Sequence, residues 1–298
     1  MTLYNITEET ATLHISKGNN KIGKGIWSFS TLPGNSDHML FLSKNENELL
    51  TDIPGTCSKY CEGCAKDGAC YAWRDAKLHH NAVIRAWAEN TVLLRNGKVW
   101  KLLNDFLNEK NKKAQKILAT ASEAGTLNDD IIQQATDVAV VKTFRINVSG
   151  EIEDPEDLIH WNAIALAHPE TTFGIYTKNF DALATYLDTF GNDGASNLVI
   201  NVSEWHGVAA AFIAKYRPLY PNAFNIFEYD DHNKTRKGAT GVHSLSKEEI
   251  ARLDALPHCP AVTKEGRHAK TSTGAPLTCD ICGKCYRKTG RWTAVWSH

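Results

Sequence analysis

Four cysteines gather in one short stretch, and they are the side chains best suited to chemistry. The stretch has too many glycines and charged residues for a core strand or a helix interior, which predicts a loop. Its cysteines are Cys57, Cys61, Cys64 and Cys70. The first three have the spacing C-x3-C-x2-C, and thiolates this close can bind one soft metal centre, iron–sulfur or zinc. Disulfides are a third interpretation, disfavoured because nothing upstream resembles a secretory signal.

A second group of four cysteines lies toward the C-terminus. Its members are Cys259, Cys279, Cys282 and Cys285. The last three have the spacing C-x2-C-x2-C, and a proline follows the first, a set that resembles the ferredoxin-type ligands of a [4Fe–4S] cluster. Zinc sites more often use two separated C-x2-C pairs, so we favour iron–sulfur over zinc. Four thiolate ligands would close this centre, which predicts electron transfer or a role in holding the tail in place.

The composition limits the class of protein. The 298 residues are 42% hydrophobic, which suffices for a sizeable core. The formal net charge of −1 argues against a molecule built as a whole for nucleic acid, although a local basic patch remains compatible with it. No leader-like segment and no apolar run of roughly 18 residues is found, so we expect a soluble cytoplasmic protein without a membrane partner. In a reducing compartment, clustered cysteines indicate metal rather than cross-links.

The elements that must position these cysteines repeat along the second half of the chain. Predicted strands end near residues 148, 176, 202 and 228, a spacing of 26 to 28 residues, which is the length of one β/α unit. Repeated units with short connections form a parallel sheet that tends to curl into a full or partial barrel. The predicted strands are 25–30, 138–148, 172–176, 197–202 and 223–228, and the predicted helices are 75–96, 99–109, 129–136, one from 155, 180–190, 208–216 and 247–256.

The sequence therefore predicts an α/β fold, namely a partial (β/α) barrel of parallel strands with a C-terminal cysteine-rich tail that binds a metal cluster. We expect three parts: a lead-in at 1–24, the barrel at 25–257 and the tail at 258–298. In such folds the chemistry lies at the carboxyl ends of the strands. Polar residues follow the predicted strands there, although each group could also be an ordinary turn.

Several of these segments together resemble the phage-associated gene product 88 domain family. They are residues 56–72, residues 144–151, residues 173–178 and the tail cysteines, and the resemblance covers the chain from about residue 25 to its end. The resemblance implies a phage-encoded protein that works in the host cytoplasm. It supplies no activity.

Within it, the first cysteine group and the strand pattern resemble the radical S-adenosylmethionine (SAM) enzymes. The resemblance implies that Cys57, Cys61 and Cys64 hold a [4Fe–4S] cluster with one iron open for SAM. Cleavage of SAM by one electron to a 5′-deoxyadenosyl radical would then start radical chemistry on an unknown substrate, with an electron donor as a further partner. The chain departs from the family at Gly63, where an aromatic residue is usual, and at Cys70, an extra thiol that could close the open iron.

The same resemblance implies contacts for SAM. Ser149-Gly150-Glu151 stands where the Gly-Gly-Glu motif of that family contacts the SAM amino group. Lys178 is implied to pair with the SAM carboxylate. Asn201 or Ser203 is implied to reach the ribose, and these last assignments follow from strand order.

Two other readings remain open. In the first, two zinc sites stabilise the fold of a non-catalytic phage or plasmid protein that binds nucleic acid or protein. Basic residues within 110–116 and 234–237 could supply its patch, although such runs are usually solvated faces. In the second, the chain is a redox protein with closed clusters and no SAM.

Overall fold

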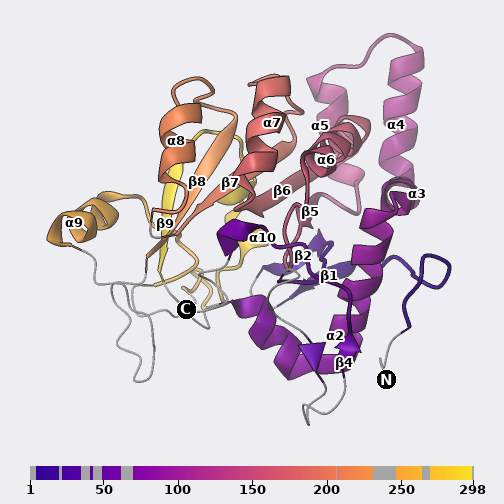
Figure 1. Cartoon of the computed structure of the whole chain (residues 1–298). Coiled ribbons are helices and arrows are strands. Elements are labelled where there is room, and N and C mark those ends of the chain that lie inside the picture. The colour runs from indigo at the N-terminus through magenta and orange to yellow at the C-terminus, as the bar shows by residue number, and fades with distance from the viewer. Residues whose placement is uncertain are drawn as a thin grey trace.

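A seven-stranded sheet runs through the computed structural model (Figure 1). The structure describes residues 5–19, 22–34, 41–42, 49–61, 70–205, 207–230, 246–263 and 269–296. The strands are β1 Ser16–Asn19, β2 Gly23–Ser28, β5 Thr143–Ile146, β6 Thr172–Thr177, β7 Leu198–Glu204, β8 Phe224–Asp230 and β9 Trp292–Trp296, in that order across the sheet. A separate two-stranded pair consists of β3 Phe41–Leu42 and β4 Leu49–Thr51.

The connecting helices lie on one face of this sheet. β1 pairs with β2 antiparallel, and every later pair in the sheet is parallel. The described helices are α2 Tyr71–Arg95, α3 Lys98–Lys110, α4 Lys112–Glu123, α5 Asp129–Val138, α6 Pro155–Ala167, α7 Phe180–Phe190, α8 Ala210–Tyr216, α9 Lys247–Ala255 and α10 Cys279–Cys282, with 3-10 turns η1 Lys59–Cys61 and η2 Lys284–Tyr286. Because the parallel strands follow one another in chain order, right-handed crossovers place α6, α7 and α8 on the same face (Figure 1).

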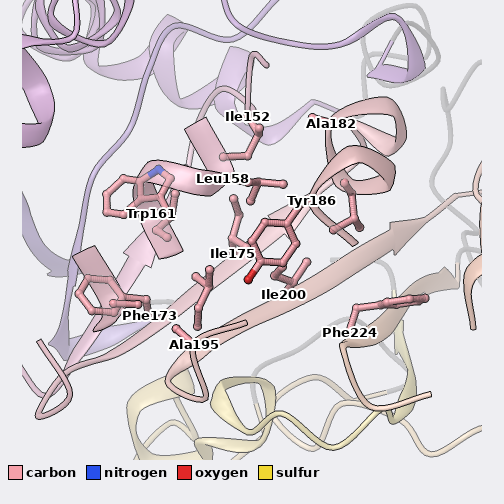
Figure 2. Packing of buried hydrophobic residues seen from close by; sticks show 14 of the residues in the cluster. Ile152, Leu158, Trp161, Phe173, Ile175, Ala182, Tyr186, Ala195, Ile200 and Phe224 are labelled. Atoms are coloured by element: carbon pink, nitrogen blue, oxygen red, sulfur yellow. The ribbon is translucent and has the colours of Figure 1, made fainter. Parts of the chain in front are cut away.

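The helix-covered face of the sheet forms the main core. Trp161 of α6 is only 1% exposed, and its ring centroid lies 5.9 Å from that of Phe144 and 6.2 Å from that of Phe173. From α7, the hydroxyl of Tyr186 donates a hydrogen bond of 2.9 Å to Asn162 of α6. Figure 2 shows Trp161, Phe173 and Tyr186 between strands and helices. Burial of large rings on both layers fixes the helices against the strands.

The opposite face of the sheet, which we call the inner face, is polar. Side chains alternate along a strand, so Phe173 and Ile175 point into the core while Tyr176, the residue after Ile175, points to the inner face. Asn201 of β7 and Asn225 of β8 are partners in register, and both are buried. Because buried amides require hydrogen-bond partners, another segment must cover this face.

Most predicted elements of the second half are confirmed. Strands predicted at 172–176, 197–202 and 223–228 are β6, β7 and β8, and the helices predicted at 99–109, 180–190 and 247–256 are α3, α7 and α9. The mixed α/β fold with a mostly parallel sheet is likewise confirmed. The elements that were not predicted include α4, whose lysine-rich sequence hides the buried stripe Ala114, Leu118 and Ala121, and β9 in the tail.

The strand predicted to begin at Val138 is wrong in its first part. α5 continues to Val138, and β5 spans only Thr143–Ile146. Between them, the side-chain oxygen of Asn111 accepts hydrogen bonds of 3.0 Å from the Val140 N–H and 2.8 Å from the Val141 N–H. One side chain therefore takes the place of a neighbouring strand. The side chains of Val138 and Val140 are exposed, although the apolar run suggested a buried strand.

The sheet is not seen to close into a barrel. Among the described strands, pairing runs from β1 to β9, and these two form the edges. Strand β2 begins at Gly23, within the expected lead-in, and β9 belongs to the tail. The lead-in, the β/α region and the tail therefore contribute strands to one sheet.

A buried carboxylate attaches the N-terminal segment to α2. One oxygen of Glu89 accepts hydrogen bonds from the Thr12 N–H at 2.9 Å and from the Thr12 hydroxyl at 2.7 Å, and it lies 2.9 Å from His14 Nε2. The other oxygen accepts from Arg85 Nε at 2.7 Å. Burial alone would raise the pKa of this carboxyl, but the hydrogen bonds from Arg85, His14 and Thr12 outweigh it and lower the pKa to about 2.

We expect Glu89→Gln to lower the free energy of unfolding by roughly 1–3 kcal/mol at pH 7. Because the pKa of Glu89 in the folded protein lies below its ordinary value of 4.5, this stabilisation is present above about pH 4.5 and is lost as the pH falls toward 2. Urea unfolding at pH 7 and at pH 3 measures both effects. The control is Glu123→Gln, which removes an exposed carboxylate at the end of α4. Equal unfolding free energies for the two variants at pH 7 would contradict the prediction.

Candidate cysteine centres

The first cysteine loop is attached to the segment that follows β2. The Thr56 N–H donates to the Leu32 carbonyl at 3.0 Å, and the Cys57 N–H donates to the Gly34 carbonyl at 2.8 Å. The Gly34 N–H in turn donates to Cys57 Sγ at 3.1 Å. These hydrogen bonds hold the Cys57 sulfur beside the backbone of the segment that follows β2.

Residues 58–60 of the loop, which follow Cys57, are anchored to the segment after β6 and to α7. The Ser58 hydroxyl donates to the Lys178 carbonyl at 3.2 Å, just beyond the end of β6. The Tyr60 hydroxyl donates to Asp181 at 3.0 Å, and the Tyr60 ring packs on Phe180 with 4.7 Å between centroids. An ion pair of 2.8 Å joins Lys59 to the same carboxylate. The described part of the loop therefore lies beside the segments that follow β2 and β6.

Two thiols of the loop are electrostatically unequal. A hydrogen bond between Cys57 and Cys61, helped by the nearby Lys178 ammonium, lowers the pKa of Cys61 to about 6. The same hydrogen bond, together with burial, raises the pKa of Cys57. A thiol whose pKa is lowered is the better metal ligand near neutral pH, because only the thiolate coordinates.

Gly150 joins the segment after β5 to this loop. Its φ of +79° is in the left-handed region, and a Cβ placed there would lie 1.9 Å from Thr31 Oγ1 and 2.7 Å from Thr56 Oγ1. Those two hydroxyls are 2.8 Å apart, and the Glu151 N–H donates to Thr56 Oγ1 at 2.8 Å. Only glycine fits this close approach of three backbone segments.

The buried carboxylate of Glu151 lies near Cys61 and the Lys178 backbone. Its two oxygens accept hydrogen bonds from the N–H groups of Ile152 at 3.0 Å and Lys178 at 2.7 Å. Burial raises the pKa of Glu151 to about 7, and the negative charge of Cys61 acts in the same direction. This edge of the sheet therefore combines a carboxyl whose pKa is about 7 with thiols and a lysine, and such perturbed pKa values are typical of functional sites.

The structure thus brings part of the predicted site together. Cys57, Cys61, Glu151 and Lys178 meet at the carboxyl edge, with Ser149 buried next to them. Ser203 lies near the end of β7, half-buried. Cys64 lies outside the described residues, and Cys70 is the half-buried N-cap residue of α2.

Asn201, the other predicted ribose contact, has protein partners in the sheet and in the tail. Its amide donates to the Ile175 carbonyl and to the Cys285 carbonyl, each at 3.1 Å. Its oxygen accepts from the Asn225 amide at 3.2 Å, and that amide also donates to the Arg287 carbonyl at 3.0 Å. The two asparagines therefore hold the backbone of the tail on the inner face of the sheet.

The tail crosses the inner face from one side of the sheet to the other. At β2, the Asp280 N–H donates to the Ile22 carbonyl at 3.0 Å, and the Asp280 carboxylate accepts from the Gly25 N–H at 3.2 Å. At β6, the ring of Tyr286 occupies the space above Gly174, where a Cβ would lie 2.4 Å from Tyr286 Cε1. Beyond β7 and β8, the tail ends as β9 beside β8.

The four tail thiols lie within electrostatic reach of one another. Burial raises the pKa of Cys259 to about 11, and the charges of Cys285, Cys279 and Cys282 act in the same direction. Burial also raises the pKa of Cys285, opposed by a hydrogen bond with Tyr176 and by the charges of nearby arginines. The seven described cysteines are not in disulfides.

The donor chemistry of both groups fits a soft metal, because buried thiols beside cations are typical of such sites. The distances between the donor side chains are longer than in a formed metal site. Among the described residues, no three His, Cys, Asp or Glu side chains are close enough to hold one ion. For the first group, Cys64 lies outside that comparison. Gathering the tail thiols on one ion would require movement of α10 or η2.

Sequence reasoning missed the residues that receive the tail. They are Arg145, Gly174, Tyr176 and Asn225 on the strands and Tyr286 in the tail. One signal was present, because asparagine is disfavoured in strand interiors and two stand inside β7 and β8. Such residues indicate a sheet face that needs polar partners.

With this geometry in place, the chain can be compared with known proteins. The model of the family described as gene product 88 matches residues 13–288. The chain belongs to the gene product 88 family. No curated protein and no solved structure matches it. The family match covers both cysteine groups and eight of the nine strands described above, β9 lying beyond it.

The comparison confirms the family and leaves the activity open. Gene product 88 is a description without a reaction, so the chemistry must be argued from the site. No described helix has the length and apolar character to span a bilayer.

Proposed function

We propose that this gene product 88 chain is an iron–sulfur protein of radical SAM type, which cleaves SAM reductively to start radical chemistry on a substrate of unknown class. One observation carries the proposal: the cysteine loop, the segment around Gly150 and the end of β6 meet at the carboxyl edge of consecutive parallel strands. This is where parallel β/α folds place their chemistry. A solvated surface loop would not need this density of buried contacts.

The loop thiols would hold the reactive cluster. Cys57 and Cys61 lie at the edge, and Cys64 completes the C-x3-C-x2-C set in the sequence. When bound, a [4Fe–4S] cluster supplies the electron that cleaves SAM. The protein part of the work is to hold the sulfurs beside the backbone and to exclude water through the packing of Tyr60 on Phe180.

SAM would bind next to these thiols. We assign its amino group to the segment Ser149-Gly150-Glu151, whose tight approach to Thr31 and Thr56 sets the position of its backbone. We assign its carboxylate to Lys178 and its ribose to Ser203. Asn201 is the weaker ribose candidate, because its amide already binds two carbonyl groups and Asn225.

The tail thiols would form a second, closed centre. Cys259, Cys279, Cys282 and Cys285 supply four ligands, so no position is left open for SAM or substrate. This centre would lie on the inner face next to Tyr176, a residue of β6 that precedes Lys178 by two positions. We therefore assign the tail centre to electron transfer toward the edge or to stabilisation of the sheet.

The test is the metal content and SAM response of anaerobically purified protein. The proposal predicts brown protein with about eight irons per chain, as for two [4Fe–4S] clusters, and an EPR signal of the reduced protein that changes on addition of SAM. Colourless protein with about two zinc ions would instead support a zinc-stapled scaffold. Iron without any response to SAM would support a redox protein.

Glu151→Gln provides a sharper test. We expect SAM affinity to fall about tenfold, a loss of about 1.4 kcal/mol, with unchanged iron content. Glutamine has one acceptor oxygen where the carboxylate has two, so one of the N–H groups of Ile152 and Lys178 loses its partner. Equilibrium dialysis with labelled SAM measures the affinity. The control is Glu123→Gln, which removes an exposed carboxylate at the end of α4; equal SAM affinity in both variants would count against the assignment.

A further inference from the structure

Asn147 directly follows β5 and has an unusual backbone conformation. Its φ is +50°, and among the described residues it is the one with a positive φ that is not a glycine. The left-handed region is unfavourable for residues with a Cβ, although asparagine tolerates it better than most. Glycine would adopt the same conformation without a steric penalty. The turn alone therefore does not explain why this position has an amide side chain.

The side-chain oxygen of Asn147 is a buried acceptor that lacks a partner. The residue is 5% exposed, and its Oδ1 accepts no hydrogen bond from any described group. Phe144 and Ile146 lie in the core, so alternation along the strand places Asn147 on the inner face. A buried acceptor costs free energy unless a donor reaches it. This oxygen is therefore suited to a ligand that supplies an N–H or O–H group.

The same segment contains a second acceptor of this kind. Ser149 is 2% exposed, and its hydroxyl oxygen also lacks a partner within the described ranges. The Ser149 carbonyl, in contrast, accepts from the Thr31 N–H at 3.0 Å. Both carboxylate oxygens of Glu151 accept from backbone N–H groups. Of the side-chain oxygens in residues 147–151, those of Asn147 and Ser149 thus remain available to a ligand.

The position of Asn147 relates these oxygens to the proposed SAM site. Ile146 and Ile175 are the last registered pair of β5 and β6, and Asn147 comes next along the chain. Beyond it, the Lys178 N–H donates to the Glu151 carboxylate at 2.7 Å, so the two segments stay together past the strand ends. Asn147 therefore stands directly before the segment to which the SAM amino group is assigned.

An ammonium group requires what this segment offers. It carries three N–H donors and no acceptor, so its burial requires several oxygens with free lone pairs. Neutral amide and hydroxyl oxygens meet that requirement, and the buried carboxylate of Glu151 lies on the same segment. A charged donor also forms stronger hydrogen bonds to such oxygens than a neutral one does.

We propose that the side-chain oxygen of Asn147 accepts a hydrogen bond from the ammonium group of SAM, together with the Ser149 hydroxyl. The assignment rests on the proposed function and adds to it a residue that sequence reasoning did not select. Asn147 meets two demands at once, because it adopts the left-handed turn and carries the acceptor.

Two substitutions separate these demands. In Asn147→Gly the positive φ is retained and the oxygen is lost, whereas in Asn147→Asp both are retained. If Asn147 serves only the turn, the glycine variant should bind SAM as the parent does. If its oxygen binds the ammonium group, aspartate should restore what glycine loses.

The experiment measures the affinity of anaerobically purified protein for labelled SAM by equilibrium dialysis. We expect Asn147→Gly to weaken binding about tenfold and Asn147→Asp to remain within about threefold of the parent. A SAM analogue whose α-amino group is replaced by hydrogen should bind the parent and the glycine variant equally. The control is Asn128→Gly, which removes an exposed amide that caps α5 and should leave both affinities unchanged.

Urea unfolding provides a second measurement that does not depend on SAM. The Asn147 oxygen has no partner within the described structure, so Asn147→Gly should unfold at a urea midpoint no lower than that of the parent. A clearly lower midpoint would show that the amide supports the fold, and it would overturn the assignment.

The binding results separate failure of this assignment from failure of the proposed function. SAM binding of equal affinity in the parent and in Asn147→Gly would remove the role of Asn147 and leave the SAM site standing. Equal losses in the glycine and aspartate variants would show that no acceptor is needed at this position. A tenfold loss that persists with the analogue would remove the contact to the amino group. No SAM binding by the parent would overturn the proposed function itself.

Discussion

Gly150→Ala is expected to lower the free energy of unfolding by about 2–4 kcal/mol and to detach the cysteine loop from the segment after β5. Two effects add. The φ of +79° is unfavourable for any residue with a Cβ, and that Cβ would lie 1.9 Å from Thr31 Oγ1. Movement of Thr31 would break its 2.8 Å hydrogen bond with Thr56, the residue next to Cys57. The substitution should therefore change both the stability of the fold and the position of Cys57, a proposed metal ligand.

Gly125→Ala is the matched control for this prediction. Gly125 also has a positive φ, of +65°, but nothing lies within 4 Å of its Cβ position. Its replacement should cost only the backbone strain, about 1 kcal/mol, and should leave the metal content unchanged. Urea unfolding and iron or zinc analysis of the two variants supply the comparison. If both glycines tolerate alanine equally well, the close approach at Gly150 is not what holds the loop.

Asn225→Ala should release the tail from the inner face. Its amide donates to Asn201 and to the Arg287 carbonyl, and its oxygen accepts from the N–H groups of Thr289 at 3.2 Å and Arg291 at 3.3 Å. Alanine leaves these groups unpaired in a buried place, at a cost of about 2–4 kcal/mol. We expect a lower urea midpoint and faster cleavage by trypsin after the tail residues Arg287 and Arg291.

The control for this variant is Asn128→Ala. That asparagine caps α5 by accepting from the Ile131 N–H at 3.0 Å, and it is exposed. Its loss should cost about 1 kcal/mol without any change in the cleavage of the tail. Tail cleavage at the same rate in both variants would mean that Asn225 does not anchor the tail.

The sequence predicted the β/α units well because their signals are local. Period-two strands and amphipathic helices such as α7, with its stripe from Phe180 to Leu187, are visible in a short window. The predicted start of β5 was wrong because a side chain that is distant in the sequence determines where the strand begins. Asn111 satisfies the N–H groups of Val140 and Val141, and no local pattern reveals that partner.

Only the part of the candidate site that lies at the ends of the strands could be predicted from the sequence. The rule that chemistry lies at carboxyl ends placed Glu151 and Lys178 beside the cysteine loop. The rule says nothing about the inner face, where Arg145 and Asn225 meet a tail that lies more than 60 residues later in the chain. The alternating pattern Trp292 to Trp296 could have revealed β9, since it follows a strand period.

The path of the tail bears on how the molecule is made. A chain leaves the ribosome N-terminus first, and its early parts begin to fold before its last residues appear. Strands β2 to β8 can assemble in that time, yet the amides of Asn201 and Asn225 meet their partners only when residues 285–291 have been synthesised. The cysteines that we propose as ligands of the tail centre include Cys285 of this same segment, so we expect the proposed centre to form only after residues 285–291 have left the ribosome.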